Sequence, residues 1–572
     1  MLRATNNTIS KFTSSRLIRT KHTSHFEGAD FNSYFRTEVA KVDSWLKSTR
    51  FKNVKRPYSA EDIVKHRGSI SPSQLSYPSS VQAEKLFSLL EEHFNSRKPL
   101  HTLGVLDPVQ MSQLSKCEDI KVAYVSGWAC SSTMVGSTNE VSPDFGDYPY
   151  NTVPNQVERI FKAQQMHDRK AFLETYNQAK NGSTDPIFVD YMKPIIADGD
   201  MGHGGPTTVM KLAKLFAEKG AAGVHLEDQM VGGKRCGHLS GAVLVPTGAH
   251  LSRLIATRFQ WDILGTENLL LARTDSCNAK LISSDIDPRD HSFIQGILDQ
   301  KTDRWADLLL RLESEEADKS TIAQAEAEWY DKNKLYTYEE MIQERFTESE
   351  YGHYKQKKEE YLQRANKNFL SIKEMKSVAT QVNANKRLEF CWMAPRTKEG
   401  YYMFKGGMEP AIRRSLVFAP YSDMIWLETK TPDVAQARSF AKEIHDVYPF
   451  VKFVYNLSPS FNWGAHGFSK DEMKSFIWDL AQEGFVLQLV SLAGLHTNAA
   501  SFWELASNFQ TEGMKAYVEK VQSREKDLNC DVLTHQKWSG AEYMDSLLQV
   551  VQNGSSSQTM STSGESFTEN QF

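Results

Sequence analysis

Short apolar runs recur through the middle and C-terminal parts of the chain, and each run ends at a polar or charged residue. The runs are residues 122–125 before Ser126, 195–197 before Asp198, 224–226 before Glu227, 269–272 before Arg273, 424–427 before Glu428, 453–455 before Asn456 and 487–490 before Ser491. Runs this short, bounded by polar residues, are typical of buried strands. Helical patterns such as 209–219 and 247–264 lie between them. The alternation predicts βαβ units and a parallel sheet.

Seven strand ends that carry functional residue types match a TIM (β/α)8 barrel, whose active site lies at the C-terminal ends of its strands. We therefore predict an α/β chain with this barrel. No apolar run marks the eighth strand. Our interpretation places it near Asn151-Thr152-Val153.

The regions outside the barrel pattern are helical. Phe31, Phe35, Val39, Val42 and Leu46 recur at steps of three and four, which predicts an amphipathic helix. The resulting division is a helical N-terminal region at 27–116, barrel segments at 117–298 and 387–510, an inserted helical subdomain at 299–386, and C-terminal helices with a tail at 511–572. The insert is predicted because its sequence is heavily charged and its apolar residues are sparse.

Composition narrows the class of protein. The chain has 572 residues, of which 24% are charged and 40% hydrophobic, with a net charge of −4. This balance gives no drive toward nucleic acid, and no apolar run approaches the ~18 residues that span a bilayer. The six cysteines are scattered without a CxxC pair, which suits a reducing compartment and argues against a zinc site.

Residues 1–26 differ from the rest of the chain. They contain Arg3, Lys11, Arg16, Arg19 and Lys21, many hydroxyl residues and no acidic residue. This composition is typical of a mitochondrial transit peptide, and the alternative is an ordinary disordered basic terminus. The C-terminus is not a peroxisomal Ser-Lys-Leu signal. We expect the mitochondrial matrix as the location.

One stretch concentrates reactive groups. Cys236 lies between the cations Lys234 and Arg235 and the imidazole of His238. Gly237, which has no side chain, would let the backbone approach a ligand closely. Neighbouring positive charge lowers a cysteine pKa and favours the thiolate. The alternative is a structural cysteine that packs as a small hydrophobic residue.

The stretch Lys-Arg-Cys-Gly-His resembles the signature of the isocitrate lyase family. Further motifs match in family order: Ser126-Gly127-Trp128, the Ala-Asp-Gly-Asp run at 197–200, Arg273-Thr274-Asp275, and Asn-Leu-Ser-Pro-Ser-Phe-Asn-Trp at 456–463. The resemblance extends from about residue 30 to the C-terminus. It implies a helical insert, a last barrel helix exchanged between the subunits of a homotetramer, and a C-terminal segment that helps to cover the active site.

The resemblance also implies roles for individual residues. Asp198 would bind Mg²⁺ directly, with Asp144, Asp200 and Glu227 around the metal's waters. Cys236 would be the proton donor, and Lys234, Arg235 and His238 would set its electrostatics. The implied substrate-binding residues are Ser126, Gly127, Trp128, Gly237, His238, Arg273, Glu428, Asn456, Ser458, Ser460, Leu489 and Ser491. The alternatives are an acidic turn at 198–200 and an internal salt bridge from Arg273 to Glu227 or Asp275.

Two positions bear on the substrate, a small tricarboxylic acid. Typical isocitrate lyases carry phenylalanine and threonine where this chain has Leu489 and Ser491, which are both smaller. The extra room would fit one methyl group, so the resemblance implies cleavage of (2R,3S)-2-methylisocitrate to pyruvate and succinate. The alternative within the family is cleavage of isocitrate to glyoxylate and succinate. Competing classes outside it are a phosphonomutase or oxaloacetate hydrolase, and a non-enzymatic interaction protein.

Overall fold

The computed structural model describes residues 30–72, 75–134, 142–237, 239–298, 302–554, 560 and 571. The expected transit peptide at 1–26 and the candidate residue His238 lie outside these residues. The chain forms two compact units, one made of Met1–Lys52 with Tyr58–Ser76 and the other of Asn53–Pro57 with Tyr77–Phe572.

The described residues of the first unit include the helices α1 (Phe31–Leu46) and α2 (Ala60–Val64). The predicted amphipathic helix is confirmed as α1, which Asp30 caps and in which Val42 is buried. Ser59 and Asp62 form a capping box at the start of α2, and α2 buries Ile63 and Val64.

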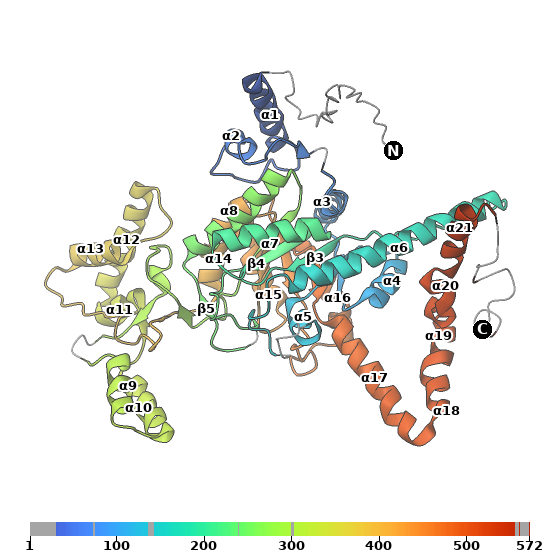
Figure 1. The fold of residues 1–572 in the computed structure, drawn as a ribbon. Helices are drawn as coiled ribbons and strands as arrows, with labels where there is room; N and C mark the ends of the chain where they lie inside the picture. The colour runs from blue at the N-terminus through green and yellow to red at the C-terminus, as the bar shows by residue number, and fades with distance from the viewer. Residues whose placement is uncertain are drawn as a thin grey trace, which may run out of the picture. The chain divides into compact units, whose positions relative to one another are not determined.

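The second unit is built on a closed barrel of eight parallel strands, with helices around it (Figure 1). The strands are β1 (Leu100–Gly104), β2 (Val122–Val125), β3 (Ile195–Asp198), β4 (Gly223–Glu227), β6 (Leu269–Thr274), β11 (Met424–Leu427), β12 (Lys452–Asn456) and β13 (Leu487–Val490). Their order around the barrel is β1-β13-β12-β11-β6-β4-β3-β2. The predicted TIM barrel is confirmed, and each of the seven apolar runs forms a strand.

The predicted position of the eighth strand is wrong. That strand is β1, which pairs with β13 and β2 and lies inside the range 27–116 assigned to a helical region before the barrel. Asn151-Thr152-Val153 instead begins α6 (Thr152–Lys180). Pro154 lies in the first turn of this helix, where proline is tolerated because the first N–H groups have no partner within a helix.

Helices pack around the strands, and the strands separate the apolar layer beneath the helices from the apolar layer inside the barrel. The helices are α3 (Ser79–Ser96), α4 (Pro108–Lys116), α5 (Gly127–Thr133), α6, α7 (Pro206–Lys219), α8 (Thr247–Leu264), α14 (Met408–Phe418), α15 (Val434–His445) and α16 (Lys470–Gln482). The last helix, α17 (Ala493–Glu512), extends away from the strands, and among its described residues only Gly494 is buried (Figure 1). The helical patterns at 209–219 and 247–264 are confirmed as α7 and α8. The inward-facing strand residues form their own cluster, to which α3 adds Leu86 and Leu90. Helix α3 therefore packs against the interior of the barrel.

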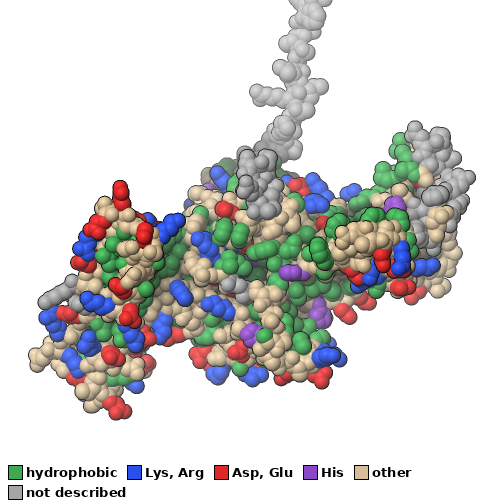
Figure 2. All heavy atoms as spheres, turned by 90° about the horizontal axis from the view of Figure 1, so that it is seen from below, with side chains coloured by type: hydrophobic (Ala, Val, Ile, Leu, Met, Phe, Trp, Pro, Cys, Tyr) green, Lys and Arg blue, Asp and Glu red, His purple; other side chains and the backbone are tan. Residues whose placement is uncertain are grey.

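The residues between β6 and β11 include a largely helical insert with its own core. Its helices are α9 (Trp305–Ser314), α10 (Lys319–Lys332), α11 (Tyr338–Arg345), α12 (Glu348–Ala365) and α13 (Ile372–Val382). One small sheet contains β10 (Tyr402–Met403), β7 (Leu281–Ile282) and β5 (Val243–Leu244). A second contains β8 (Gln295–Gly296) and β9 (Tyr336–Thr337). Figure 2 shows cationic and anionic side chains interspersed over the surface.

Short helices follow the barrel. They are α18 (Met514–Tyr517), α19 (Ser523–Asp527), α20 (His535–Ser539) and α21 (Ala541–Val551). The described residues also form the 3-10 helices η2 (His291–Phe293), η3 (Ala419–Tyr421) and η5 (Asp531–Thr534) and the π-helix η4 (Val518–Gln522). The Trp538 ring lies 5.3 Å from that of His167, so α20 packs on α6. Among the described residues, no helix combines the length and the apolar character that a membrane span requires.

Candidate active site

The polar residues at the strand ends meet in one cavity of about 250 Å³. Asp198, Arg273, Glu428 and Asn456 lie at or just after the C-terminal ends of four strands, and all four line this cavity. The lining residues are Tyr124, Ser126, Trp128, Asp144, Asp198, Cys236, Arg273, Trp426, Glu428, Asn456, Ser458, Pro459, Ser460, Ser491, Leu492 and His496.

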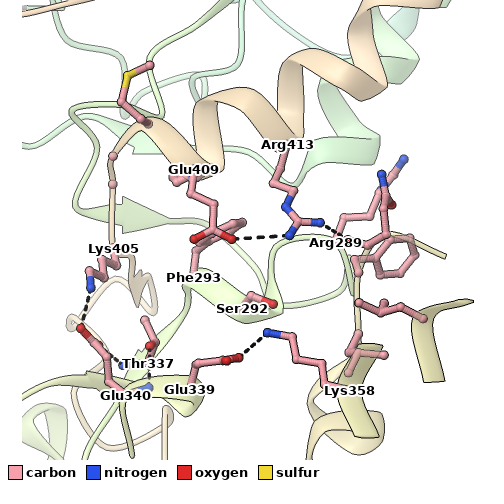
Figure 3. A pocket seen from close by; sticks show the side chains of 18 residues that line it. Arg289, Ser292, Phe293, Thr337, Glu339, Glu340, Lys358, Lys405, Glu409 and Arg413 are labelled. Atoms are coloured by element: carbon pink, nitrogen blue, oxygen red, sulfur yellow. Dashed lines mark hydrogen bonds and ion pairs between the residues drawn. The ribbon is translucent and has the colours of Figure 1, made fainter. Parts of the chain in front are cut away.

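A larger cavity, of about 400 Å³, lies between the insert and the start of α14 (Figure 3). Its charged side chains pair with one another: Lys358 with Glu339 at 2.5 Å, and Lys405 with Glu340 at 2.5 Å. These pairs neutralise the charges that a ligand would need. The smaller cavity at the strand ends, where carboxylates gather, is therefore the candidate active site.

Asp198 is fixed at the end of β3 by groups around its carboxylate. The backbone N–H of Gly127 donates to Oδ2 at 2.9 Å, and the N–H of Asp200 donates to Oδ1 at 2.9 Å. The hydroxyl of Tyr124 also donates to Oδ2, at 3.2 Å. A Cβ at Gly127 would lie 2.6 Å from the hydroxyl of Tyr148, so only glycine allows this close approach.

Three carboxylates form a compact acidic cluster. Oxygens of Asp144, Asp198 and Asp200 lie within 4.8 Å of one another. The ammonium group of Lys234 lies among them, 2.7 Å from Asp200, in an ion pair with Asp144 and 3.9 Å from Glu227. The sequence thus supplies the neutralising cation from the same loop that carries Cys236.

Burial determines the electrostatics of this cluster. It raises the pKa of Asp144 to about 7, and it raises the pKa of Asp198 and of Glu227. Burial alone would lower the pKa of Lys234, but the carboxylates of Asp144 and Asp200 raise it well above its usual value. More buried carboxylates meet here than Lys234 alone can neutralise.

The cluster fits a metal ion. Asp144 Oδ1 and Glu227 Oε1 are buried and accept no hydrogen bond from the described part of the chain. A buried carboxylate oxygen without a donor is costly, and a bound cation would remove that cost. The available ligand atoms are all oxygens, which suits a hard divalent cation such as Mg²⁺ or Ca²⁺.

Arg273, at the end of β6, also lines the cavity and contacts several carboxylates. Its guanidinium donates to Asp275 at 2.9 and 3.2 Å, and it lies 3.3 Å from Glu227 and 3.8 Å from Glu428. Burial would lower the pKa of Arg273, but Asp275 and Glu428 raise it well above its usual value. The alternative predicted from the sequence was a salt bridge from Arg273 to Glu227 or Asp275. Both salt bridges form, and Arg273 still lines the cavity.

The loop that carries Cys236 is held by a residue that sequence reasoning missed. The side-chain amide of Gln229 donates to the carbonyl of Arg235 at 2.8 Å, and its oxygen accepts the N–H of Arg235 at 2.7 Å. A Cβ at Gly237 would lie 2.5 Å from Cγ of Glu428, so the loop passes close to β11. The guanidinium of Arg235 stacks on Phe145, 4.9 Å from the ring centre.

The predicted site residues occupy three positions relative to the cavity. Those that line it are Ser126, Trp128, Asp144, Asp198, Cys236, Arg273, Glu428, Asn456, Ser458, Ser460 and Ser491. Those that support its wall without lining it are Gly127, Asp200, Glu227, Lys234, Arg235 and Gly237. Leu489 lies deeper, in the apolar cluster of the barrel interior.

Tyr124, Trp426, Pro459, Leu492 and His496 line the cavity but were not predicted as site residues. Two of them could have been found, because Tyr124 and Trp426 lie two positions before Ser126 and Glu428 on their strands and so face the same way. His496 is in the first turns of α17, and no pattern in the sequence marks it.

Comparison with known proteins identifies the family. Residues 38–572 match the model of the isocitrate lyase family. The chain belongs to the isocitrate lyase family. It is 67% identical to the mitochondrial 2-methylisocitrate lyase of Saccharomyces cerevisiae, over 96% of this chain and 94% of that protein. It is 51% identical to the mitochondrial 2-methylisocitrate lyase of Hypocrea atroviridis, over 95% of each chain.

Other members of the isocitrate lyase family are more distant. The isocitrate lyase of Saccharomyces cerevisiae is 42% identical, over 94% of this chain and 95% of that protein.

Among solved structures, the comparison with an oxaloacetate acetylhydrolase covers 77% of this chain and 89% of that chain, with 18% identity and a TM-score of 0.39.

Proposed function

We propose that this protein is a 2-methylisocitrate lyase, which cleaves (2R,3S)-2-methylisocitrate to pyruvate and succinate. The observation that carries the proposal is the single cavity in which Cys236, the acidic cluster and Arg273 meet at the mouth of the barrel. The names of relatives at 67% and 51% identity support the same substrate.

The acidic cluster would hold Mg²⁺. Asp198 would be the direct ligand, and Asp144, Asp200 and Glu227 would bind the metal's waters, since Mg²⁺ usually keeps several of them. When bound, the ion would polarise the oxygens of the keto-acid half of the substrate. Ser126, Gly127 and Trp128, which follow β2 directly, would hold the same half.

The remaining residues would handle protons and the second half of the substrate. Loss of the hydroxyl proton allows the carbon–carbon bond to break, and the bond's electrons pass to the carbon beside a carboxylate. Cys236 would donate its proton to that carbon and so give succinate. Arg273, Glu428, Asn456, Ser458 and Ser460 would bind the succinate half, and Lys234, Arg235 and His238 would set the electrostatics of the thiol.

The choice of substrate depends on the wall formed by β13. Ser491 lines the cavity, and Leu489 lies one inward-facing position below it, in the barrel interior. A larger residue at either position would reduce the space for a methyl group, directly at 491 and through packing at 489. One methyl group changes specificity by only ~1–3 kcal/mol, so some cleavage of isocitrate is expected.

Cleavage of isocitrate is the alternative, because relatives at 42% identity carry the name isocitrate lyase. The test measures kcat/KM of the purified protein on both substrates with Mg²⁺ present. We expect a preference for 2-methylisocitrate, and we expect Leu489→Phe with Ser491→Thr to shift it toward isocitrate. A wild-type preference for isocitrate would reverse the assignment. An unchanged ratio in the double variant would refute the argument from β13.

We also propose that the protein is a mitochondrial matrix homotetramer that exchanges its last barrel helix between subunits. The exposed apolar side chains of α17, which include Phe502 and Trp503 at 71% and 75% exposure, support an assembly that covers them. The mitochondrial names of the relatives and the basic, acid-free leader support the location.

A further inference from the structure

A buried arginine on α14 connects carboxylates from two distant parts of the chain. Arg414 donates from one terminal nitrogen to Asp228 Oδ2 at 2.9 Å, and from the other to Asp290 Oδ1 at 2.9 Å and to the carbonyl of Val245 at 3.0 Å. Arg414 is 2% exposed, and Asp228 and Asp290 are fully buried. A buried charge set of this kind is tolerated only where its geometry compensates for lost hydration.

Asp228 extends this connection to the end of β6. Its Oδ1 accepts the backbone N–H of Asp275 at 2.9 Å, and its Oδ2 accepts the hydroxyl of Thr274 at 2.7 Å. The side chain of Asp275 in turn accepts two hydrogen bonds from Arg273. Hydrogen bonds therefore run from Arg414 through the carboxylate of Asp228 and the backbone N–H of Asp275 to Arg273 at the cavity wall, so that two cations flank two carboxylates. We call these four residues the relay.

The other end of the relay contacts the segment that leads into the insert. Asp290 accepts the backbone N–H of Thr247 at 2.8 Å and its hydroxyl at 2.7 Å, at the start of α8. It directly precedes η2, which leads toward the insert. Arg414 thus joins the base of the insert to the wall of the cavity.

Arg273 needs such support because three carboxylates compete for it. Asp275 contacts it through two nitrogens, while Glu227 and Glu428 lie at 3.3 and 3.8 Å. If Asp275 moved, the guanidinium could turn toward Glu227 or Glu428 and away from a substrate carboxylate. A fork of two parallel hydrogen bonds depends strongly on orientation.

We propose that Arg414 is a positioning residue for substrate binding, which acts through Asp228 and Asp275 to orient Arg273 toward a carboxylate of the substrate. This inference rests on the proposed function, since it takes Arg273 as a ligand of the succinate half. It assigns to α14, outside the cavity, a part in substrate affinity.

The adjacent residue on α14 provides a matched control. Arg413 lines the larger cavity between the insert and the start of α14 (Figure 3), where it donates to the carbonyl of Asn368 and lies 3.6 Å from Glu409. Arg413→Lys and Arg414→Lys therefore make the same chemical change at neighbouring positions. Lysine keeps the charge but offers a single nitrogen, which cannot reproduce the fork between two carboxylates.

For Arg414→Lys we expect KM for 2-methylisocitrate and Kd for succinate to rise roughly tenfold, with kcat changed less, because bound substrate and transition state lose the same contact. Asp275→Asn should act in the same direction, and the double variant should be far from additive because both changes act on one relay. Arg413→Lys should leave KM and Kd unchanged.

The proposal is overturned if Arg414→Lys lowers the thermal midpoint but leaves KM and succinate Kd at their wild-type values. If Arg414→Lys does not fold, Asp228→Asn is measured in its place, because it removes the charge of Asp228 with almost no change in side-chain volume. An unchanged KM and succinate Kd in Asp228→Asn would also overturn the proposal. Failure of the wild-type protein to cleave either substrate would instead refute the proposed function. Calorimetry with succinate would still measure the relay's effect on binding.

Discussion

The mouth of the barrel and the insert both contain many charged residues, but they use them differently. At the barrel mouth, Lys234, Arg273 and Arg414 are nearly or fully buried, and each faces carboxylates from other strands or helices. In the insert, ion pairs such as Arg311 with Asp303 have side chains 59% and 66% exposed. Charges in water contribute little to stability, whereas buried ones must be compensated and their positions are fixed.

The insert is instead stabilised by local rules and a core of its own. Capping boxes begin α11, α12 and α13, and Tyr338, Met341 and Tyr354 are among its buried side chains. This difference teaches where a single charge matters. A carboxylate removed at the barrel mouth should disturb chemistry or folding, and one removed from the insert surface should do neither.

The largest effect should follow Asp198→Asn, which keeps the shape of the side chain and removes its charge. If Asp198 is a direct ligand, its loss should weaken Mg²⁺ binding, measured by calorimetry, and lower kcat/KM by at least about 100-fold. Asp446→Asn, at the exposed C-cap of α15, is the control and should change neither. Normal Mg²⁺ affinity in Asp198→Asn would exclude this residue as a ligand.

A large effect on stability should follow Asp423→Asn. Asp423 forms an ion pair with Arg258, which is 1% exposed, and accepts the N–H of Leu270 at 2.7 Å. Removing the carboxylate that faces a buried guanidinium should lower the free energy of unfolding by about 3–5 kcal/mol, as measured by urea denaturation.

The insert supplies the smaller, matched effect. Glu339→Gln removes the carboxylate paired with Lys358, where both side chains are 28% exposed, and should cost less than about 1 kcal/mol. If Glu339→Gln destabilises the protein as much as Asp423→Asn does, the contrast between buried charges of the barrel and exposed charges of the insert is wrong.

The sequence predicted most of the barrel because seven strands are short, buried apolar runs. It missed β1 because His101 and Thr102 interrupt the apolar pattern and the last inward-facing position is Gly104, which has no side chain. A Cβ at Gly104 would overlap the carbonyl oxygen of Ser491, so the strand ends in glycine because β13 lies so close. Such a contact cannot be inferred from local pattern.

The candidate site divides in the same way. Asp198, Arg273 and Glu428 could be predicted because each directly follows an apolar run. The hydrogen bonds from Gln229 to the Cys236 loop and from Arg414 to Asp228 could not be predicted, because they depend on tertiary packing. Asp228 and Arg414 lie 186 positions apart in the chain. Sequence pattern therefore found residues on the strands but not those that hold them.

The most direct test of the account is the turnover of 2-methylisocitrate by Cys236→Ala with Mg²⁺ present. The variant removes only the thiol from the cavity wall, so succinate should bind as in the wild-type protein while kcat falls by at least about 100-fold. Turnover at the wild-type rate in this variant would contradict the claim that the Cys236 thiol supplies the proton.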